Sequence, residues 1–170
     1  AAVDGFSDDY AFVARGLLDL FEATGKVETL ERTLAVAEPL WSRFGGDEGY
    51  GLTDTPADGE TLILTTREVY DGPTPSANSA ALELFARLWL ITGEPVWEER
   101  ARALLVAFTK TVRRFPAAYC HFLQAAALII EPTRQLVIVG DKAQPETLAL
   151  RRAICSSDSR ESTGTYKETN

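Results

Sequence analysis

The chain has 170 residues, of which 45% are hydrophobic and 25% are charged, and its net charge is -8. This composition is that of one globular domain, and no apolar run is long enough to cross a membrane. Residues 1–100 carry 19 acids and 7 bases, so this part lacks the clustered lysines and arginines with which proteins bind nucleic acid.

Five main helices are predicted from apolar residues that recur with the helical period. The first, third and fifth are apolar over most of their circumference, which predicts burial, whereas the second and fourth each have one apolar face. Ser7 and Asp8 are expected to cap the first helix, Thr74 or Ser76 the third, and Pro39 is expected to kink or split the second. The predicted helices cover residues 10–23, 29–44, about 79–91, 95–114 and 116–131.

Smaller elements are expected around these helices. A β-hairpin near 49–66 would pair Tyr50 and Leu52 with Leu62 and Leu64 across a Pro-Ala-Asp-Gly turn. Further along, a short strand at 136–139 and a small helix at 145–154 are predicted. The expected organisation is therefore a helical segment at 1–132, a strand-helix appendage at 133–155 and a polar, disordered tail at 156–170.

The two pairs of long helices repeat with a shift of 68 residues. Thr24-Gly25 then aligns with Thr92-Gly93, Glu31-Arg32 with Glu99-Arg100, and apolar positions coincide as well. Alternating buried and amphipathic helices are typical of an α/α toroid, in which an outer ring of helices covers an inner ring. We therefore predict an all-α fold, a partial (α/α)6 toroid whose inner helices all begin at the same rim. Five helices cannot close such a ring, so a longer chain or a homo-oligomer is expected to cover the inner helices.

Several motifs together resemble one family. They are Asp8-Asp9-Tyr10-Ala11-Phe12, 47–51 (Asp-Glu-Gly-Tyr-Gly), Tyr70-Asp71-Gly72, 75–79 (Pro-Ser-Ala-Asn-Ser), 92–95 (Thr-Gly-Glu-Pro) and 137–140 (Val-Ile-Val-Gly). In this order and spacing they are similar to the C-terminal part of the thioredoxin-domain family related to spermatogenesis-associated protein 20. The resemblance implies a longer parent chain, with upstream hairpins and a thioredoxin-like domain as intramolecular partners. It also implies a toroid similar to six-hairpin glycosidases and N-acylglucosamine 2-epimerases.

Asp9 and Asp71 form the candidate catalytic pair, because both are expected at the rim. Glycoside chemistry needs two carboxyl groups, one to protonate the leaving oxygen and one to act as base or nucleophile. Both residues also have a structural explanation. Acids are favoured in the first turn of a helix, and Asp71 suits a turn before the third helix.

Tyr10, Arg67, Glu68 and Asn78 are the candidate ligand-binding residues at the same rim. Arg67 and Glu68 would alternatively form an exposed ion pair, and Asn78 would bond back to its loop. His121 is the only histidine, so the paired histidines of the similar epimerases cannot be supplied here, and it is expected to be a buried helix residue.

The sequence indicates no metal site and no cofactor, because Cys120 and Cys155 have neither redox nor zinc-ligand spacing. With no secretory signal visible, a cytoplasmic location is expected. The absence of Met, even at position 1, leads us to expect a piece of a longer protein. Two functions are compatible with these patterns: binding or processing of a sugar-like molecule at the rim, or a non-catalytic scaffold that supports a thioredoxin-like domain or a partner protein.

Overall fold

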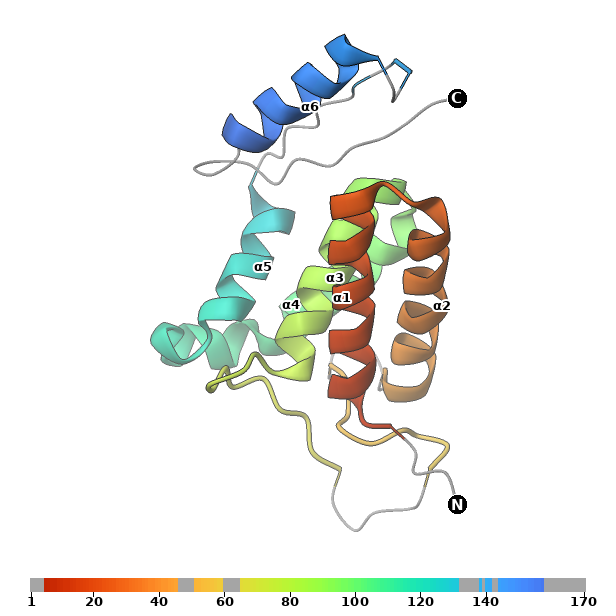
Figure 1. Cartoon of the computed structure of the whole chain (residues 1–170). Helices are drawn as coiled ribbons and strands as arrows, with labels where there is room; N and C mark the ends of the chain where they lie inside the picture. The colour runs from red at the N-terminus through yellow and green to blue at the C-terminus, as the bar shows by residue number, and fades with distance from the viewer. Residues whose placement is uncertain are drawn as a thin grey trace. The chain divides into compact units, whose positions relative to one another are not determined.

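The chain is all-α in the part that its computed structural model describes, which is residues 5–45, 51–59, 65–131, 138, 140, 141 and 144–157. It divides into two units, 1–131 and 132–170. The first unit contains five α-helices and a 3-10 turn, and the second contains α6 (Figure 1). The helices are α1 (Ser7–Thr24), α2 (Val27–Phe44), α3 (Ala77–Thr92), α4 (Pro95–Arg114), the turn η1 (Pro116–Ala118), α5 (Cys120–Ile130) and α6 (Pro145–Ser157).

The C-terminal ends of α1 and α3 are built alike, as the repeat of 68 residues predicts. Gly25 and Gly93 both adopt left-handed conformations, with φ of 65° and 72°. Their N–H groups donate to the carbonyl oxygens of Phe21 and Trp89, at 2.6 and 2.8 Å. Glycine is suited to this position because a Cβ atom disfavours positive φ. Local sequence therefore ends both helices in the same way.

The N-terminal ends of these helices differ. The Ser76 hydroxyl caps α3 by accepting a hydrogen bond from the Ser79 N–H at 3.1 Å, as predicted. Capping of α1 by Ser7 and Asp8 is wrong, because this helix already begins at Ser7 and its N-cap residue is Phe6. The Phe6 N–H is satisfied instead by Oδ2 of Asp9 at 2.9 Å, which is one half of a capping box.

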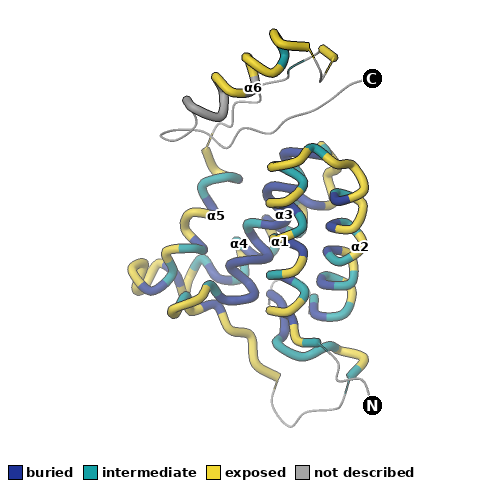
Figure 2. The backbone as a smooth tube through the Cα atoms, in the orientation of Figure 1, coloured by how far each residue is buried: buried dark blue, intermediate teal, exposed yellow. Residues whose placement is uncertain are grey.

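The core is centred on α3, which packs against α1, α4 and α5. Thirteen of its sixteen residues are buried, whereas only four of the eighteen residues of α1 are (Figure 2). The prediction that α1 and α5 are buried nearly all round is therefore wrong, since Val13, Leu20, Leu123 and Ile130 are exposed. Burial depends on the number of neighbouring helices. Helix α3 packs against α1, α4 and α5, whereas α1 packs against α2 and α3.

Two further predictions concern the region after α1. The helix α2 is continuous through Pro39, so the predicted split does not occur. Leu52 forms an isolated antiparallel bridge with Gly45, and its predicted partners Leu62 and Leu64 are not among the described residues. Residues 60–64 and Tyr50 lie outside the described residues, as do 136, 137 and 139 of the predicted strand and 158–170 of the predicted tail. The hairpin, the strand and the three-part division of the chain stay predictions.

Candidate functional site

An open groove lies at the N-terminal ends of α1 and α3, which is the predicted rim. Its volume is about 450 Å³. Three carboxylates line it, from Asp8, Asp54 and Glu68, together with the rings of Phe6, Phe12 and Tyr70 and the turn at 72–77 that leads into α3. The volume is within the usual range for small-molecule sites. Among the described residues that line the groove, none is a lysine, an arginine or a histidine.

The groove carboxylates are only partly engaged by the protein. Oε1 of Glu68 accepts hydrogen bonds from the N–H groups of Val69 and Tyr70, at 2.9 and 2.6 Å. Oδ1 of Asp8 accepts from the N–H of Asp9 at 3.0 Å. Among the described residues, no hydrogen bond reaches the second oxygen of either carboxylate. Each therefore has an acceptor available for a ligand.

Asp54 is bound more fully. The hydroxyl of Thr66 donates to Oδ2 of Asp54, and the Glu68 N–H donates to its Oδ1 at 3.5 Å. This carboxylate joins the two described segments on either side of 60–64. Its contribution to the groove is therefore to position Glu68.

The predicted catalytic pair does not line this groove. Oδ2 of Asp9 accepts from the Phe6 N–H, and Asp71 binds two N–H groups, those of Ser76 at 3.1 Å and Phe122 at 3.0 Å. Asp71 thus connects the starts of α3 and α5, because each of its oxygens accepts from a different helix. These contacts account for both acids structurally, and their catalytic role stays a prediction.

The predicted ligand-binding residues are dispersed. Glu68 lines the groove. Tyr10 instead accepts a hydrogen bond from Nη1 of Arg43 at 2.8 Å and packs on Phe44. Asn78 is fully buried, and its amide bonds the backbone of Leu52 and Glu68. Arg67 is exposed and is not among the lining residues.

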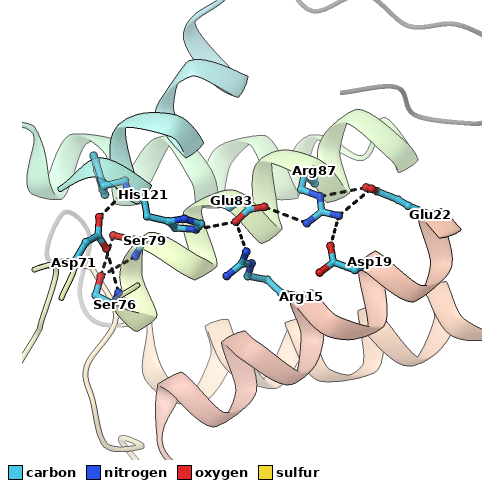
Figure 3. A network of polar contacts seen from close by, with 10 residues as sticks. Arg15, Asp19, Glu22, Asp71, Ser76, Ser79, Glu83, Arg87 and His121 are labelled. Atoms are coloured by element: carbon cyan, nitrogen blue, oxygen red, sulfur yellow. Dashed lines mark hydrogen bonds and ion pairs between the residues drawn. The ribbon is translucent and has the colours of Figure 1, made fainter. Parts of the chain in front are cut away.

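A second group of polar residues connects α1, α3 and α5 (Figure 3). Arg87 of α3 is at its centre, with ion pairs to Asp19 at 2.6 Å, to Glu22 at 2.9 Å and to Glu83 at 3.1 Å. The side chain of Arg87 is only 8% exposed. A buried guanidinium needs several partners, and these three acids supply them.

Glu83 also contacts side chains of α1 and α5. Its Oε2 lies 2.9 Å from Nη2 of Arg15 and 2.8 Å from Nε2 of His121. The groups are close enough for ion pairing, but their N–H bonds are not aligned for hydrogen bonds to Oε2. His121 is therefore a partly buried helix residue that faces a carboxylate.

The network shifts the pKa values of Glu22 and Glu83 in opposite directions. Burial raises the pKa of Glu22, and the nearby Arg87 offsets this only in part. Burial also acts to raise the pKa of Glu83, but the contacts with His121, Arg15 and Arg87 together outweigh it and lower this pKa. The arrangement thus keeps Glu83 ionised within the helix array.

The sequence analysis did not identify this network, although a signal was present. Arg15 and Glu83 are 68 residues apart, as are Asp19 and Arg87, and each pair has opposite charges. Contact between equivalent positions at two successive turns shows that α1 and α3 run parallel and in register. Opposite charges at equivalent positions of two mostly apolar helices were therefore the signal from which these contacts could have been predicted.

The described residues contain neither a cluster of metal-binding side chains nor a membrane-spanning helix. Within them, no three His, Cys, Asp or Glu side chains are grouped so that they could hold a metal ion. Likewise, none of the helices described is long and apolar enough to cross a membrane.

Comparison with known proteins shows homology over most of the chain. It is 36% identical over 153 residues to spermatogenesis-associated protein 20 of Homo sapiens, which covers 89% of the chain and 20% of that protein. The corresponding protein of Mus musculus is 35% identical, with 89% and 19% covered. An uncharacterized protein of Caenorhabditis elegans, B0495.5, is 27% identical over 139 residues, with 82% and 19% covered.

No family model matches the chain. The chain spans about a fifth of the length of these relatives. The resemblance to spermatogenesis-associated protein 20 is therefore confirmed as homology, and the thioredoxin-like domain and the toroid that it implies stay predictions.

Proposed function

We propose that this homologue of spermatogenesis-associated protein 20 binds a neutral, sugar-like molecule in the groove at the N-terminal ends of α1 and α3. The observation that carries the proposal is the composition of the groove, in which acceptor oxygens of Asp8 and Glu68 lie among the aromatic rings of Phe6 and Tyr70. Phe6 and Tyr70 are 50% and 56% exposed, so their rings are accessible to a ligand.

The chemistry of these side chains favours a polyhydroxylated ligand. Ionised carboxylates only accept hydrogen bonds, and the hydroxyl groups of a sugar donate them. An aromatic ring offers an apolar face for the C–H side of a sugar ring. Phosphorylated or acidic ligands are disfavoured, because the described part of the groove lining presents carboxylates and no cationic side chain.

The proposal is one of binding and does not depend on catalysis by Asp9 and Asp71. The contacts of Asp71 with Ser76 and Phe122 predict a structural effect for Asp71→Asn, because an amide provides one acceptor oxygen where the carboxylate provides two. We expect a loss of about 1–2 kcal/mol in the free energy of unfolding, and no loss of sugar binding at temperatures where the variant is folded. Loss of binding by the folded variant would instead support the predicted role of Asp71 at the site.

Titration of the chain with glucose, N-acetylglucosamine and maltose, followed by the shifts of backbone amide NMR signals, tests the proposal. We expect saturable shifts at residues around Asp8, Glu68 and Tyr70. Asp8→Asn and Tyr70→Ala should each weaken binding by about tenfold, the effect of losing one polar or aromatic contact. Glu31→Gln, an equally small charge change on the exposed surface of α2, is the control and should bind as the wild type does.

The alternative function, a non-catalytic scaffold, predicts a different outcome. A scaffold requires no ligand at the rim, and the structural roles of Asp9, Asp71 and Asn78 agree with it. Absence of saturable shifts with all three sugars, in a chain that gives a folded spectrum, would overturn the sugar-binding proposal and favour the scaffold.

A further inference from the structure

The side-chain amide of Asn78 is fully buried at the N-terminal end of α3. Its Oδ1 accepts a hydrogen bond from the Leu52 N–H at 2.7 Å, and its Nδ2 donates to the carbonyl oxygens of Leu52 at 3.0 Å and Glu68 at 2.8 Å. Both donors of the amide are therefore used, and they connect α3 to the two described segments on either side of 60–64.

These bonds require an amide of this length. Aspartate has nearly the same shape but offers no donor when ionised, and glutamine would add a methylene group to a site with no exposed surface. The adjacent backbone is equally close. Gly51 has a φ of 77°, and a Cβ atom there would lie 3.0 Å from Oδ1 of Asn78 and 2.4 Å from Cε2 of Phe108. Glycine at this position thus allows the backbone to approach the amide.

The Glu68 peptide groups are held by two side chains. Its N–H donates to Oδ1 of Asp54 at 3.5 Å, and its carbonyl oxygen accepts from Nδ2 of Asn78 at 2.8 Å. The side chain of Glu68 lines the groove, and its Oε2 accepts no hydrogen bond among the described residues. Because the bond to Asn78 is the shorter of the two, Asn78 provides the stronger constraint on where this carboxylate lies.

We infer that Asn78 is a positioning residue for the groove. By holding the backbone of Glu68, it places the Glu68 carboxylate where a hydroxyl group of a sugar can donate to Oε2. Asn78 is not among the residues that line the groove, so it acts through Glu68 rather than by contact with the ligand. The inference rests on the proposed function, because it concerns the affinity of the same groove for a sugar.

A double-mutant cycle tests this link. Asn78→Asp removes both donors, and Glu68→Gln replaces the available Oε2 by a nitrogen that does not accept. Each variant should bind glucose, N-acetylglucosamine or maltose, whichever the wild type binds most tightly, about tenfold more weakly in NMR titrations at temperatures where it is folded. The double variant should also lose about tenfold, because the two substitutions remove the same contact.

The matched control for the cycle combines Asn78→Asp with Asp8→Asn. Asp8 lines the same groove, but among the described residues no hydrogen bond joins it to Asn78. The two losses should therefore multiply to about a hundredfold.

Thr33→Val is the control for removal of a buried polar group at another place. The Thr33 hydroxyl is buried in α2 and donates to the carbonyl oxygen of Thr29 at 2.9 Å. This variant should bind the sugar as the wild type does, even though it loses a buried hydrogen bond.

Hydrogen exchange of the wild-type chain tests the same link without a substitution, and so covers the case in which Asn78→Asp does not fold. The Leu52 N–H is bonded to Asn78, and Leu52 is not among the residues that line the groove. Saturation with the sugar should slow exchange of this N–H more than that of Ala37, a buried residue of α2. The reason is that a ligand bound to Glu68 stabilises the bonds of Asn78 in particular.

The outcomes separate this inference from the proposed function. Absence of saturable shifts in the wild type with all three sugars would overturn both. If the wild type binds, then unchanged affinity of folded Asn78→Asp would overturn the inference alone. A loss of about a hundredfold in Asn78→Asp combined with Glu68→Gln would do the same, as would equal slowing of exchange at Leu52 and Ala37.

Discussion

The two helical hairpins, α1–α2 and α3–α4, have the same construction but different surroundings. Helices α1 and α3 end at glycines with the same conformation, and their charged positions 15 and 83, and 19 and 87, contact one another. Yet α3 is buried on nearly every side, while α1 is buried on one. Equivalent sequence therefore determines how the two helices end and how they are in register with each other, and the number of neighbours determines how much of each helix is buried.

The largest expected difference between the hairpins is at Leu20 and Leu88, which are equivalent in the repeat. Leu88 is fully buried and Leu20 is 50% exposed. Leu88→Ala should lower the free energy of unfolding by about 3 kcal/mol, since it leaves a cavity in the core. Leu20→Ala should change it by about 0.5 kcal/mol or less. Urea denaturation at low protein concentration measures both, and equal effects would contradict the burial difference.

The polar network provides the next comparison. Arg87→Met leaves Asp19, Glu22 and Glu83 without their shared cation and should cost about 2 kcal/mol, a value reduced because Asp19 is 60% exposed. Arg102→Met removes an exposed pair with Glu98 within α4 and should cost about 0.5 kcal/mol or less. A similar cost for both substitutions in thermal unfolding would show that the network is no more stabilising than a surface pair.

The glycines that end α1 and α3 should behave alike despite the difference in burial. Both have positive φ, at 65° and 72°. Gly25→Ala and Gly93→Ala should each cost about 1 kcal/mol, because a Cβ atom disfavours this conformation. Urea denaturation of the two variants checks this, and a cost at only one glycine would show that the hairpins are not equivalent in their local structure.

The smallest expected effect is a dependence on pH with opposite signs at Glu83 and Glu22. The lowered pKa of Glu83 contributes stability above its unfolded value of 4.5, and this contribution is lost as the pH falls through the folded value. The raised pKa of Glu22 has the reverse effect, so that stability increases as the pH falls toward 4.5. Relative to Glu83→Gln, the wild type should lose stability below about pH 4.5.

Glu22→Gln is the control for this experiment, because it changes the same type of residue in the same network. Relative to this variant, the wild type should gain stability as the pH is lowered from 7 toward 4.5. Unfolding curves measured at several pH values give both differences. Curves that run parallel for the wild type and both variants would show that neither carboxyl group has a shifted pKa.

Much of the fold could be predicted from short stretches of sequence. The bounds of α2 and α4 follow from their apolar period and from Gly45 and Pro95, and the Ser76 cap follows from the preference of short polar side chains for that position. The burial of α1 and α5 could not be predicted in the same way. Both have the composition of core helices, but apolar residues on each stay exposed, namely Val13 and Leu20 on α1 and Leu123 and Ile130 on α5.

The candidate site could likewise be predicted only in part from the sequence. The sequence placed Asp8, Glu68, Tyr70 and the turn before α3 at one rim, and the structure brings them together around a groove. The sequence could not distinguish acidic side chains that are accessible to a ligand from those that accept hydrogen bonds from the backbone. Asp8 and Asp9 are adjacent, but only Asp8 lines the groove, because Asp9 turns back to the Phe6 N–H.

Local sequence specifies the long helices, the glycines that end α1 and α3, and the repeat of 68 residues, because positive φ at glycine and apolar period act over a few residues. Tertiary structure alone decided which charges meet and which carboxylates stay available. Asp71 binds the N–H of Phe122, 51 residues away, and Arg87 meets Asp19 across two helices. Such contacts depend on the distance and direction between separate elements, and these are determined only when the helices pack together.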